Sequence, residues 1–314
     1  MNNNANLVVS PSPHVRSRIT STSIMLDVVI ALIPTLIASV FIFGFKSLVL
    51  TAFCVAVCVF AEWAFQKLCK RDVTIGDLSA VVTGILLAFN LPTTTPLWQA
   101  AFGCIVAIIV AKQLFGGIGK NFANPAITAR IVMLLSFSGT MASFPAVNDA
   151  VSGATPLAAM ASGDKLPSLL DMFLGNHSGS LGETCALTLL IGGAYLIVRK
   201  VITWHTPVVY IATVFVLTFA LGQDPLYHIL SGGLMIGAIF MATDYSTSPS
   251  TSWGKVIFGV GCGLITVLIR VYGGYPEGVS FAILLMNILT PYIDLWTKRR
   301  PFGAIKAKTK KEAM

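Results

Sequence analysis

The chain has 314 residues, of which 55% are hydrophobic and only 11% are charged. A soluble domain carries about 25% charged residues, so this balance excludes a soluble globular protein and favours helices that span a membrane. The net charge of +8 does not indicate nucleic-acid binding, because the cations gather at expected helix ends and in the C-terminal tail, where they orient a membrane protein. The polar N-terminus shows no cleavable signal peptide.

The first half of the chain is predicted to contain five apolar helices after a polar lead over residues 1–23. Their expected ranges are 24–43, 48–66, 78–89, 97–115 and 126–137. The third range holds only about a dozen residues, too few for a straight helix to cross a hydrocarbon core of about 30 Å. It is followed by Asn90-Leu91-Pro92, so a short or broken helix is expected there.

The second half is predicted to contain five more apolar helices, followed by a basic tail over residues 298–314. Their expected ranges are 184–198, 207–221, 229–242, 254–269 and 279–296. The third of these is again short and contains Gly232, Gly233 and Gly237. Short, glycine-interrupted segments at matching places are typical of inverted repeats whose interface holds a binding site.

The expected fold is therefore an all-α polytopic membrane protein with about ten transmembrane helices. Residues 24–137 and 183–297 form its two five-helix repeats, which are inverted because each has an odd number of helices. If the N-terminus is cytoplasmic, most Lys and Arg residues of the connections fall on the cytoplasmic side. Both termini are then cytoplasmic, and the long segment 138–182 lies outside.

The segment 138–182 is the longest polar interruption of the chain, and long loops in compact proteins are usually functional or disordered. It contains Val151-Ser152-Gly153-Ala154-Thr155-Pro156-Leu157. Pro156 favours an extended backbone at Thr155, and the small residues before it leave the hydroxyl accessible. The sequence thus predicts a threonine that is presented to another molecule.

Few ionisable residues are expected at membrane depth, and each is a functional hypothesis because a charge is costly in lipid. Glu62 lies inside the second span and Asp244 follows the second short helix, so these two carboxylates are the candidates for an ion path. No catalytic triad and no metal-ligand spacing is present. The six cysteines form no Cys-x-x-Cys pair and are expected to be buried thiols.

Two amides, Asn121 and Asn124, precede Pro125 at helix-turn spacing. An amide donates and accepts hydrogen bonds at once, which suits the edge of a heteroaromatic ring. Asn-Pro also favours a turn or a helix cap, so both interpretations remain open from the residues alone.

Ser152-Gly153-Ala154-Thr155 resembles the flavinylation motif of a family of membrane subunits. The family includes RnfD, of the Rnf ferredoxin:NAD⁺ oxidoreductase, and NqrB, of the sodium-pumping NADH:quinone oxidoreductase. Three further stretches resemble it: Gly76-Asp77-Leu78-Ser79 to Asn90-Leu91-Pro92, Gly116-Gly117-x-Gly119-x-Asn121-x-x-Asn124-Pro125-Ala126, and Ala242-Thr243-Asp244 to Ser248-Pro249. The match covers nearly the whole chain, and the short N-terminus is closer to RnfD than to NqrB.

The resemblance implies FMN joined covalently through its phosphate to Thr155 by a separate flavin transferase, with Ser152, Gly153 and Ala154 completing the motif. It also implies riboflavin near Asn121 and Asn124. The implied partners are membrane lipid and the subunits RnfA, RnfB, RnfC, RnfE and RnfG.

The implied function is electron transfer between ferredoxin and NAD⁺ coupled to Na⁺ or H⁺ transport in the cell membrane. No complete active site is expected on this chain alone. The inverted repeat and the broken helices also fit a solute channel or transporter without flavin. A purely structural assembly subunit is the third alternative.

Overall fold

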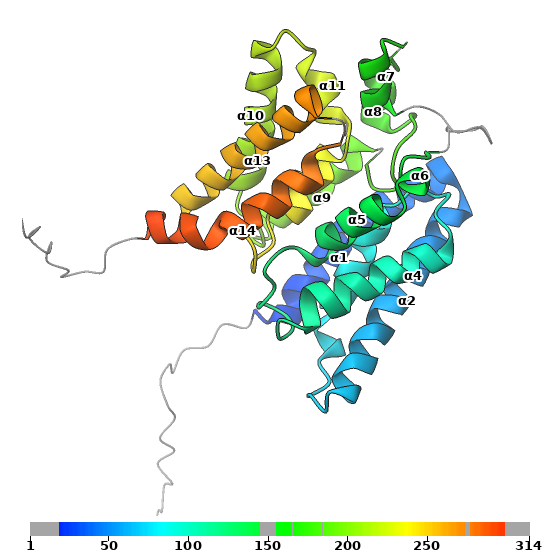
Figure 1. Cartoon of the computed structure of the whole chain (residues 1–314), viewed down its shortest axis with the longest axis vertical. Helices are drawn as coiled ribbons and strands as arrows, with labels where there is room; N and C mark the ends of the chain where they lie inside the picture. Colours follow the sequence, from blue (N-terminus) through cyan, green and yellow to red (C-terminus); the bar gives the residue numbers. More distant parts are fainter. Residues whose placement is uncertain (1–18, 145–154, 165, 184, 274–276, 299–314) are drawn as a thin grey trace, which may run out of the picture.

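The computed structural model describes residues 19–144, 155–164, 166–183, 185–273 and 277–298. Within these ranges the chain is helical, with turns and loops and no strand. Figure 1 shows the helices of the first half, coloured blue to green, beside those of the second half, coloured yellow to red. The two halves meet where α1 contacts α9 and where α5 contacts α14.

The first half consists of three long helices, one of which is α4 continued by η2, and two shorter helices, α3 and α5. Its elements are α1 (Ser21–Phe43), α2 (Phe45–Leu68), the short 3₁₀ turn η1 (Ile75–Asp77), α3 (Ser79–Phe89), α4 (Leu97–Ile105), the π-helix η2 (Val106–Gln113) and α5 (Pro125–Ser136). Helix α4 continues directly into η2. Helix α3 packs closely on α2, because a Cβ atom on Gly84 would lie 2.8 Å from the Cα atom of Val55.

The connecting segment contains three short helices in its described part, where the sequence predicts a loop. They are α6 (Ser138–Met141), α7 (Pro156–Ser162) and α8 (Leu169–Leu174). Thr155 and Ser168 cap the N-termini of α7 and α8 with their side-chain oxygens, and Gly163 and Gly175 end them in left-handed conformations. These caps satisfy end groups that helices of six or seven residues cannot satisfy internally.

The second half also alternates long helices with a broken one. Its elements are α9 (Ala186–Val198), α10 (His205–Ala220), α11 (Pro225–Leu230), α12 (Leu234–Ile236), the π-helix η3 (Gly237–Met241), α13 (Ser252–Tyr272) and α14 (Val279–Thr297). The break between α11 and α12 falls at Gly232 and Gly233, which both have positive φ. The predicted short, glycine-interrupted helix is thereby confirmed.

In the described part of the chain, four helices, α1, α2, α13 and α14, are long and apolar enough to cross a membrane. Their outer faces are apolar: the side chains of Phe41 and Trp296, for example, are 85% and 78% exposed. An apolar exterior of this kind suits lipid as solvent, so the chain is a multi-pass helical membrane protein.

Candidate functional site

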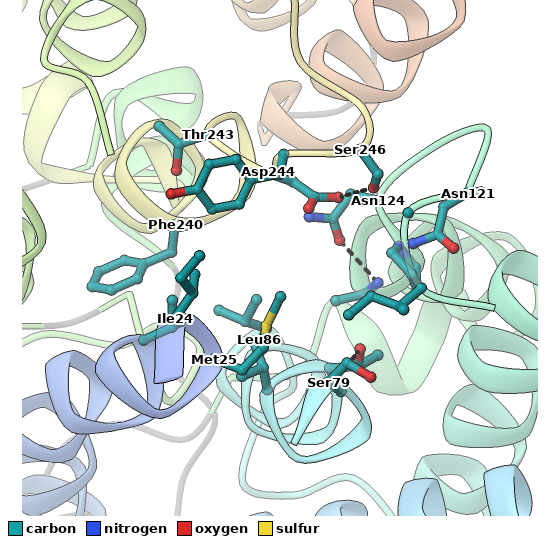
Figure 2. A pocket seen from close by; sticks show the side chains of 18 of the residues that line it. Ile24, Met25, Ser79, Leu86, Asn121, Asn124, Phe240, Thr243, Asp244 and Ser246 are labelled. Atoms are coloured by element: carbon teal, nitrogen blue, oxygen red, sulfur yellow. Dashed lines mark hydrogen bonds between the residues drawn. The ribbon is translucent and has the colours of Figure 1, made fainter. Parts of the chain in front are cut away.

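A cavity of about 360 Å³ lies between the two halves. Its walls come from α1, α3, η2, the loop before α5, the end of α9, η3 and the segment that follows η3. Figure 2 shows Ile24, Met25, Leu86 and Phe240 on its apolar sides, with the polar groups of Asn121, Asn124, Asp244 and Ser246 gathered on another. A largely apolar cavity of about 300–1,000 Å³ with a few converging polar groups is typical of small-molecule sites.

Asn121 and Asn124 both line this cavity, but their amides are used differently. The Oδ1 atom of Asn124 accepts hydrogen bonds from the N–H groups of Ala126 and Ile127, so it caps α5. Its Nδ2 atom donates to the carbonyl oxygen of Met241 at 3.3 Å. The Oδ1 atom of Asn121 is buried and has no hydrogen-bond partner among the described residues. Asn124 therefore shapes the cavity, while Asn121 lies at its wall with the nitrogen of its amide on the cavity side (Figure 2).

Asp244 lies where η3 ends, on the polar side of the cavity (Figure 2). Its Oδ2 atom accepts hydrogen bonds of 3.1 Å from the hydroxyls of Ser246 and Thr247. Two hydroxyl donors hold this carboxylate at the wall without neutralising its charge. The structure thus brings Asp244 to the same cavity as the two amides, although it lies far from them in sequence.

Lys112 also lines the cavity, and it is bound to Glu62 on α2. The Nζ atom of Lys112 lies 2.8 and 2.9 Å from the two carboxylate oxygens of Glu62 and 2.6 Å from the Oγ atom of Ser79. Both charged side chains are buried, with 2% and 1% exposure. The three N–H groups of the ammonium therefore have three acceptors.

Glu62 receives further hydrogen bonds from two glutamines. The Nε2 atom of Gln113 donates to its Oε1 atom at 2.6 Å, and that of Gln66 does so at 3.5 Å. Gln66 is in turn bonded to the side chain and backbone of Thr74, an exposed residue. Glu62 is thus connected through one amide to the surface.

A second polar route leaves Lys112 through Ser79. The hydroxyl of Ser79 donates to the Oδ1 atom of Asp77 at 2.5 Å, and the backbone N–H of Ser79 donates to the same oxygen. Leu78, with φ +62°, makes the corner that folds Asp77 back onto Ser79. The Oδ2 atom of Asp77 is buried and has no hydrogen-bond partner among the described residues.

Thr155 lies within the connecting segment, at the N-terminus of α7. It has an extended backbone, with φ −68° and ψ 155°, as Pro156 predicts. Its half-buried side chain accepts a hydrogen bond of 3.3 Å from the N–H of Ala158. The other members of the predicted motif, Ser152, Gly153 and Ala154, lie outside the described residues.

The helix that begins after Thr155 rests on the break in the second half. The space for a Cβ atom on Gly232 is taken by the Cδ1 atom of Leu157 and the guanidinium of Arg270. Arg270 donates hydrogen bonds to the carbonyl oxygens of His228, Ser231 and Gly232. Arg130, in contrast, links the two halves, because it donates to Asn90 in the first half and to Glu277 in the second.

Sequence reasoning identified Glu62 but missed its partner Lys112. A signal was present, because Lys112 is a lone cation within the apolar range 97–115, opposite a lone carboxylate in the range 48–66. Charges at membrane depth usually pair with one another. The pairing of Arg130 with Glu277 had a weaker signal, because Glu277 lies in a connection between spans.

Comparison with known proteins identifies the family of this chain. Residues 8–303 match the NQR2, RnfD, RnfE family. The chain belongs to this family, and the resemblance inferred from the motifs is confirmed.

The curated relatives are similar over nearly their whole length. The D subunit of the Na⁺-translocating ferredoxin:NAD⁺ oxidoreductase complex of Acetobacterium woodii is 49% identical, covering 99% of this chain and 100% of the relative. The D subunit of the proton-translocating ferredoxin:NAD⁺ oxidoreductase complex of Clostridium ljungdahlii is 41% identical, covering 94% and 96%. The D subunit of an ion-translocating oxidoreductase complex of Halorhodospira halophila is 36% identical, covering 93% and 94%.

Proposed function

We propose that this chain is the flavin-carrying RnfD component of an ion-translocating ferredoxin:NAD⁺ oxidoreductase complex. The observation that carries the proposal is the full-length similarity to the D subunits of such complexes, which includes 49% identity to one of them. The four long apolar helices agree with a membrane-embedded component. The chain supplies no complete active site, and its partners are the other Rnf subunits, RnfA, RnfB, RnfC, RnfE and RnfG.

FMN is covalently attached at Thr155 in this proposal. The hydroxyl loses its proton, the oxygen–phosphorus bond forms, and the leaving group of an activated flavin nucleotide departs in a reaction catalysed by a separate flavin transferase. The geometry supports this assignment, because Thr155 uses an oxygen lone pair, and not its proton, to cap α7. Covalent attachment keeps the redox group at a high effective concentration beside its electron donor and acceptor.

The cavity between the halves holds a second flavin, riboflavin, in this proposal. Its volume of about 360 Å³ and its apolar walls fit a flat heteroaromatic ring, and the amide of Asn121 at the wall (Figure 2) can form a hydrogen bond to the polar edge of such a ring. Asn124, which caps α5 and lines the wall, positions this edge of the cavity. When bound, the flavin supplies one- and two-electron redox chemistry that no side chain here provides.

The membrane arrangement proposed for the protein has ten helical passes in two inverted repeats of five. Residues 24–137 and 183–297 form the repeats, and 1–23 and 298–314 are the cytoplasmic ends. The segment 138–182 lies outside with Thr155. Helix order supports this arrangement, because each half contains one broken or short third helix, α3 or α11–α12–η3, which borders the cavity.

The purified complex from cells that contain the flavin transferase tests both flavins at once. On a denaturing gel, the RnfD-like chain is expected to fluoresce under ultraviolet light, and its Thr155→Val variant is expected to be dark. Ser162→Val, on the same short helix, is the matched control and is expected to remain bright. Mass spectrometry of the peptide that spans Thr155 is expected to show one added FMN.

The second flavin is measured in the supernatant after the complex is denatured. Riboflavin is expected there in both wild type and Thr155→Val, and in reduced amount in Asn121→Ala. A dark wild-type band would contradict covalent attachment. A supernatant free of riboflavin would contradict the cavity assignment, and solute transport by the flavin-free chain would favour a channel instead.

A further inference from the structure

The Lys112–Glu62 pair presents its two charges to different surroundings. Lys112 lines the cavity, whereas Glu62 does not and has a side chain that is only 1% exposed. The Glu62 carboxylate also accepts hydrogen bonds from the amides of Gln113 and Gln66. The cavity therefore faces the cationic end of a buried ion pair.

Stability alone does not explain why a buried ion pair lies in this position. Replacing a buried ion pair by apolar side chains of similar size is often neutral or stabilising, whereas leaving one of the two charges unpaired is strongly destabilising. Lys112 stands on the π-helix η2, and π-helical turns occur frequently at functional sites. These observations point to a role for the pair in the chemistry of the cavity.

We propose that Lys112 and Glu62 couple the charge of the cavity to the binding of one monovalent cation, a proton or Na⁺, at Glu62. This inference rests on the proposed flavin in the cavity. While the cavity is neutral, the Lys112 ammonium neutralises Glu62. When electrons delivered through the complex leave one net negative charge in the cavity, the ammonium compensates that charge, and Glu62 binds one cation in place of Lys112.

Charge is conserved across this exchange, and the driving force is electrostatic. In a low-dielectric interior, two unpaired charges of opposite sign attract strongly, so a new anion in the cavity competes with Glu62 for the single ammonium. The Lys112 ammonium can move toward a new anion in the cavity by a change of side-chain rotamer alone, because a flexible chain of four carbons separates it from the backbone. On reoxidation the ammonium returns to Glu62 and displaces the cation.

Hydrogen bonds link Glu62 to an exposed residue at the edge of the protein. Gln66 lies between Glu62 and the exposed Thr74, and its amide is bonded to both. On the Lys112 side, Ser79 leads to Asp77. The arrangement therefore gives Glu62 a polar connection to the edge of the protein that bypasses the cavity.

Other charged groups lie near the pair or the cavity. Asp77 faces Ser79 from η1, and Arg71 donates to the carbonyl oxygen of Gln113 from the end of α2. Asp244 lies on the cavity wall after η3 and is bonded to two hydroxyls. Glu62 is distinguished from these because, in the described part of the chain, its carboxylate alone is bound directly to an ammonium that borders the cavity.

The test is a spectroscopic redox titration of the riboflavin in the purified complex, at several pH values and with or without Na⁺. If one extra cation binds per two electrons, each tenfold rise in the concentration of that cation is expected to raise the midpoint potential of the flavin by about 30 mV. This shift adds to the pH dependence that the flavin shows by itself. In Glu62→Gln this extra dependence is expected to disappear. A response to pH alone identifies the proton, and a response to Na⁺ at fixed pH identifies Na⁺.

The matched control is Asp27→Asn, which removes another carboxylate that is paired with a cation, Arg199, but does not line the cavity. It is expected to keep the wild-type dependence. Because Glu62→Gln leaves Lys112 unpaired, the charge-neutral double variant Glu62→Gln/Lys112→Gln is titrated as well and is expected to lack the dependence too. The FMN at Thr155 serves as an internal reference and is expected to be unchanged in all variants.

Equal cation dependence in wild type, Glu62→Gln and the double variant would overturn the coupling while leaving the proposed flavins intact. Loss of the dependence in Asp27→Asn as well would also overturn it, since the effect would then not be specific to Glu62. A wild-type complex that releases no riboflavin would instead overturn the proposed occupant of the cavity, and with it this inference.

Discussion

The Cδ1 methyl group of Leu157 occupies the space that a Cβ atom on Gly232 would need, at 2.3 Å from its ideal position. Leu157 is two residues beyond Thr155, and Gly232 is the break in the short helix of the second half. This contact packs α7, which begins just after the candidate flavin-bearing threonine, against the broken helix that continues through α12 and η3 to the cavity.

Gly232→Ala is therefore expected to displace α7 and to lower flavin attachment at Thr155. The new methyl group would collide with Leu157 and Arg270, which costs about 1–3 kcal/mol. The backbone at φ +69° adds roughly 1–2 kcal/mol of strain. Attachment is measured as in-gel flavin fluorescence per mole of protein.

Gly222→Ala is the matched control for that variant. Gly222 has almost the same φ, +72°, but no atom lies within 4 Å of the added methyl group. It is expected to show the strain in its melting temperature and to retain full fluorescence. Equal loss of fluorescence in both variants would show that the docking of Leu157 on Gly232 has no part in flavin attachment.

The two asparagines of the loop before α5 are expected to separate stability from ligand binding. Asn124→Ala removes the helix cap and the bond to Met241, so it is expected to destabilise the protein by about 1–2 kcal/mol. Asn121→Ala removes an acceptor that has no partner in the described structure, so it is expected to leave the melting temperature unchanged and to lower riboflavin retention. Thermal unfolding in detergent and flavin release are measured on the same samples. The opposite pattern would assign the cap to Asn121 and the ligand to Asn124.

The sequence predicted the helices better than it predicted their partners. Apolar runs and glycine or proline interruptions give the positions of α3 and of the broken α11–α12–η3, because these signals are local. The sequence could not show that Asn121, Lys112 and Asp244 line one cavity, because that depends on how distant helices pack. It also missed the helical caps of the connecting segment, where Thr155 and Ser168 each begin a helix of six or seven residues. Such short helices show no periodicity.

The Lys112–Glu62 pair is expected to show strong coupling in a double-mutant cycle of stability. Lys112→Met alone leaves the Glu62 carboxylate buried and unpaired, which costs about 3–5 kcal/mol. The double variant Lys112→Met/Glu62→Gln is expected to be more stable than the sum of the single effects allows. The melting temperature of each variant in the same detergent gives the comparison.

The Asp27–Arg199 pair supplies the reference for this cycle. Its Arg199 side chain is 56% exposed, whereas that of Lys112 is 2% exposed. Because Arg199 is exposed and the buried Asp27 keeps its hydrogen bond from Tyr195, Arg199→Met is expected to lower stability less than Lys112→Met does. Similar cycles for the two pairs would contradict the view that burial makes Lys112 and Glu62 interdependent.

The connecting segment is expected to loosen in acid because of His177, between α8 and α9. Burial lowers the pKa of His177 to about 4, and a hydrogen bond to the Asp171 backbone and the Asp171 carboxylate offset this shift only in part. The Nδ1 atom of His177 is buried without a hydrogen-bond partner in the described structure. The folded segment thus favours the neutral imidazole, whose pKa in the unfolded chain is about 6.5. The resulting stability is fully present above that value and is lost as the pH falls from about 6.5 toward 4. The difference amounts to about 3 kcal/mol.

Hydrogen exchange of residues 166–183 measures this loosening, and His177→Gln is expected to abolish its dependence on pH between about 6.5 and 4. The Asp171 carboxylate titrates in a separate window, because its pKa is lowered, chiefly by its hydrogen bond to Ser168. Its contribution is therefore lost only as the pH falls below its usual value of about 3.9. A second histidine, His228, lies on α11, which contacts α8. The chains with His177 and with His177→Gln are therefore both measured in a His228→Gln background, which removes the titration of His228. If exchange in that background still rises in acid without His177, another group controls the docking of α8.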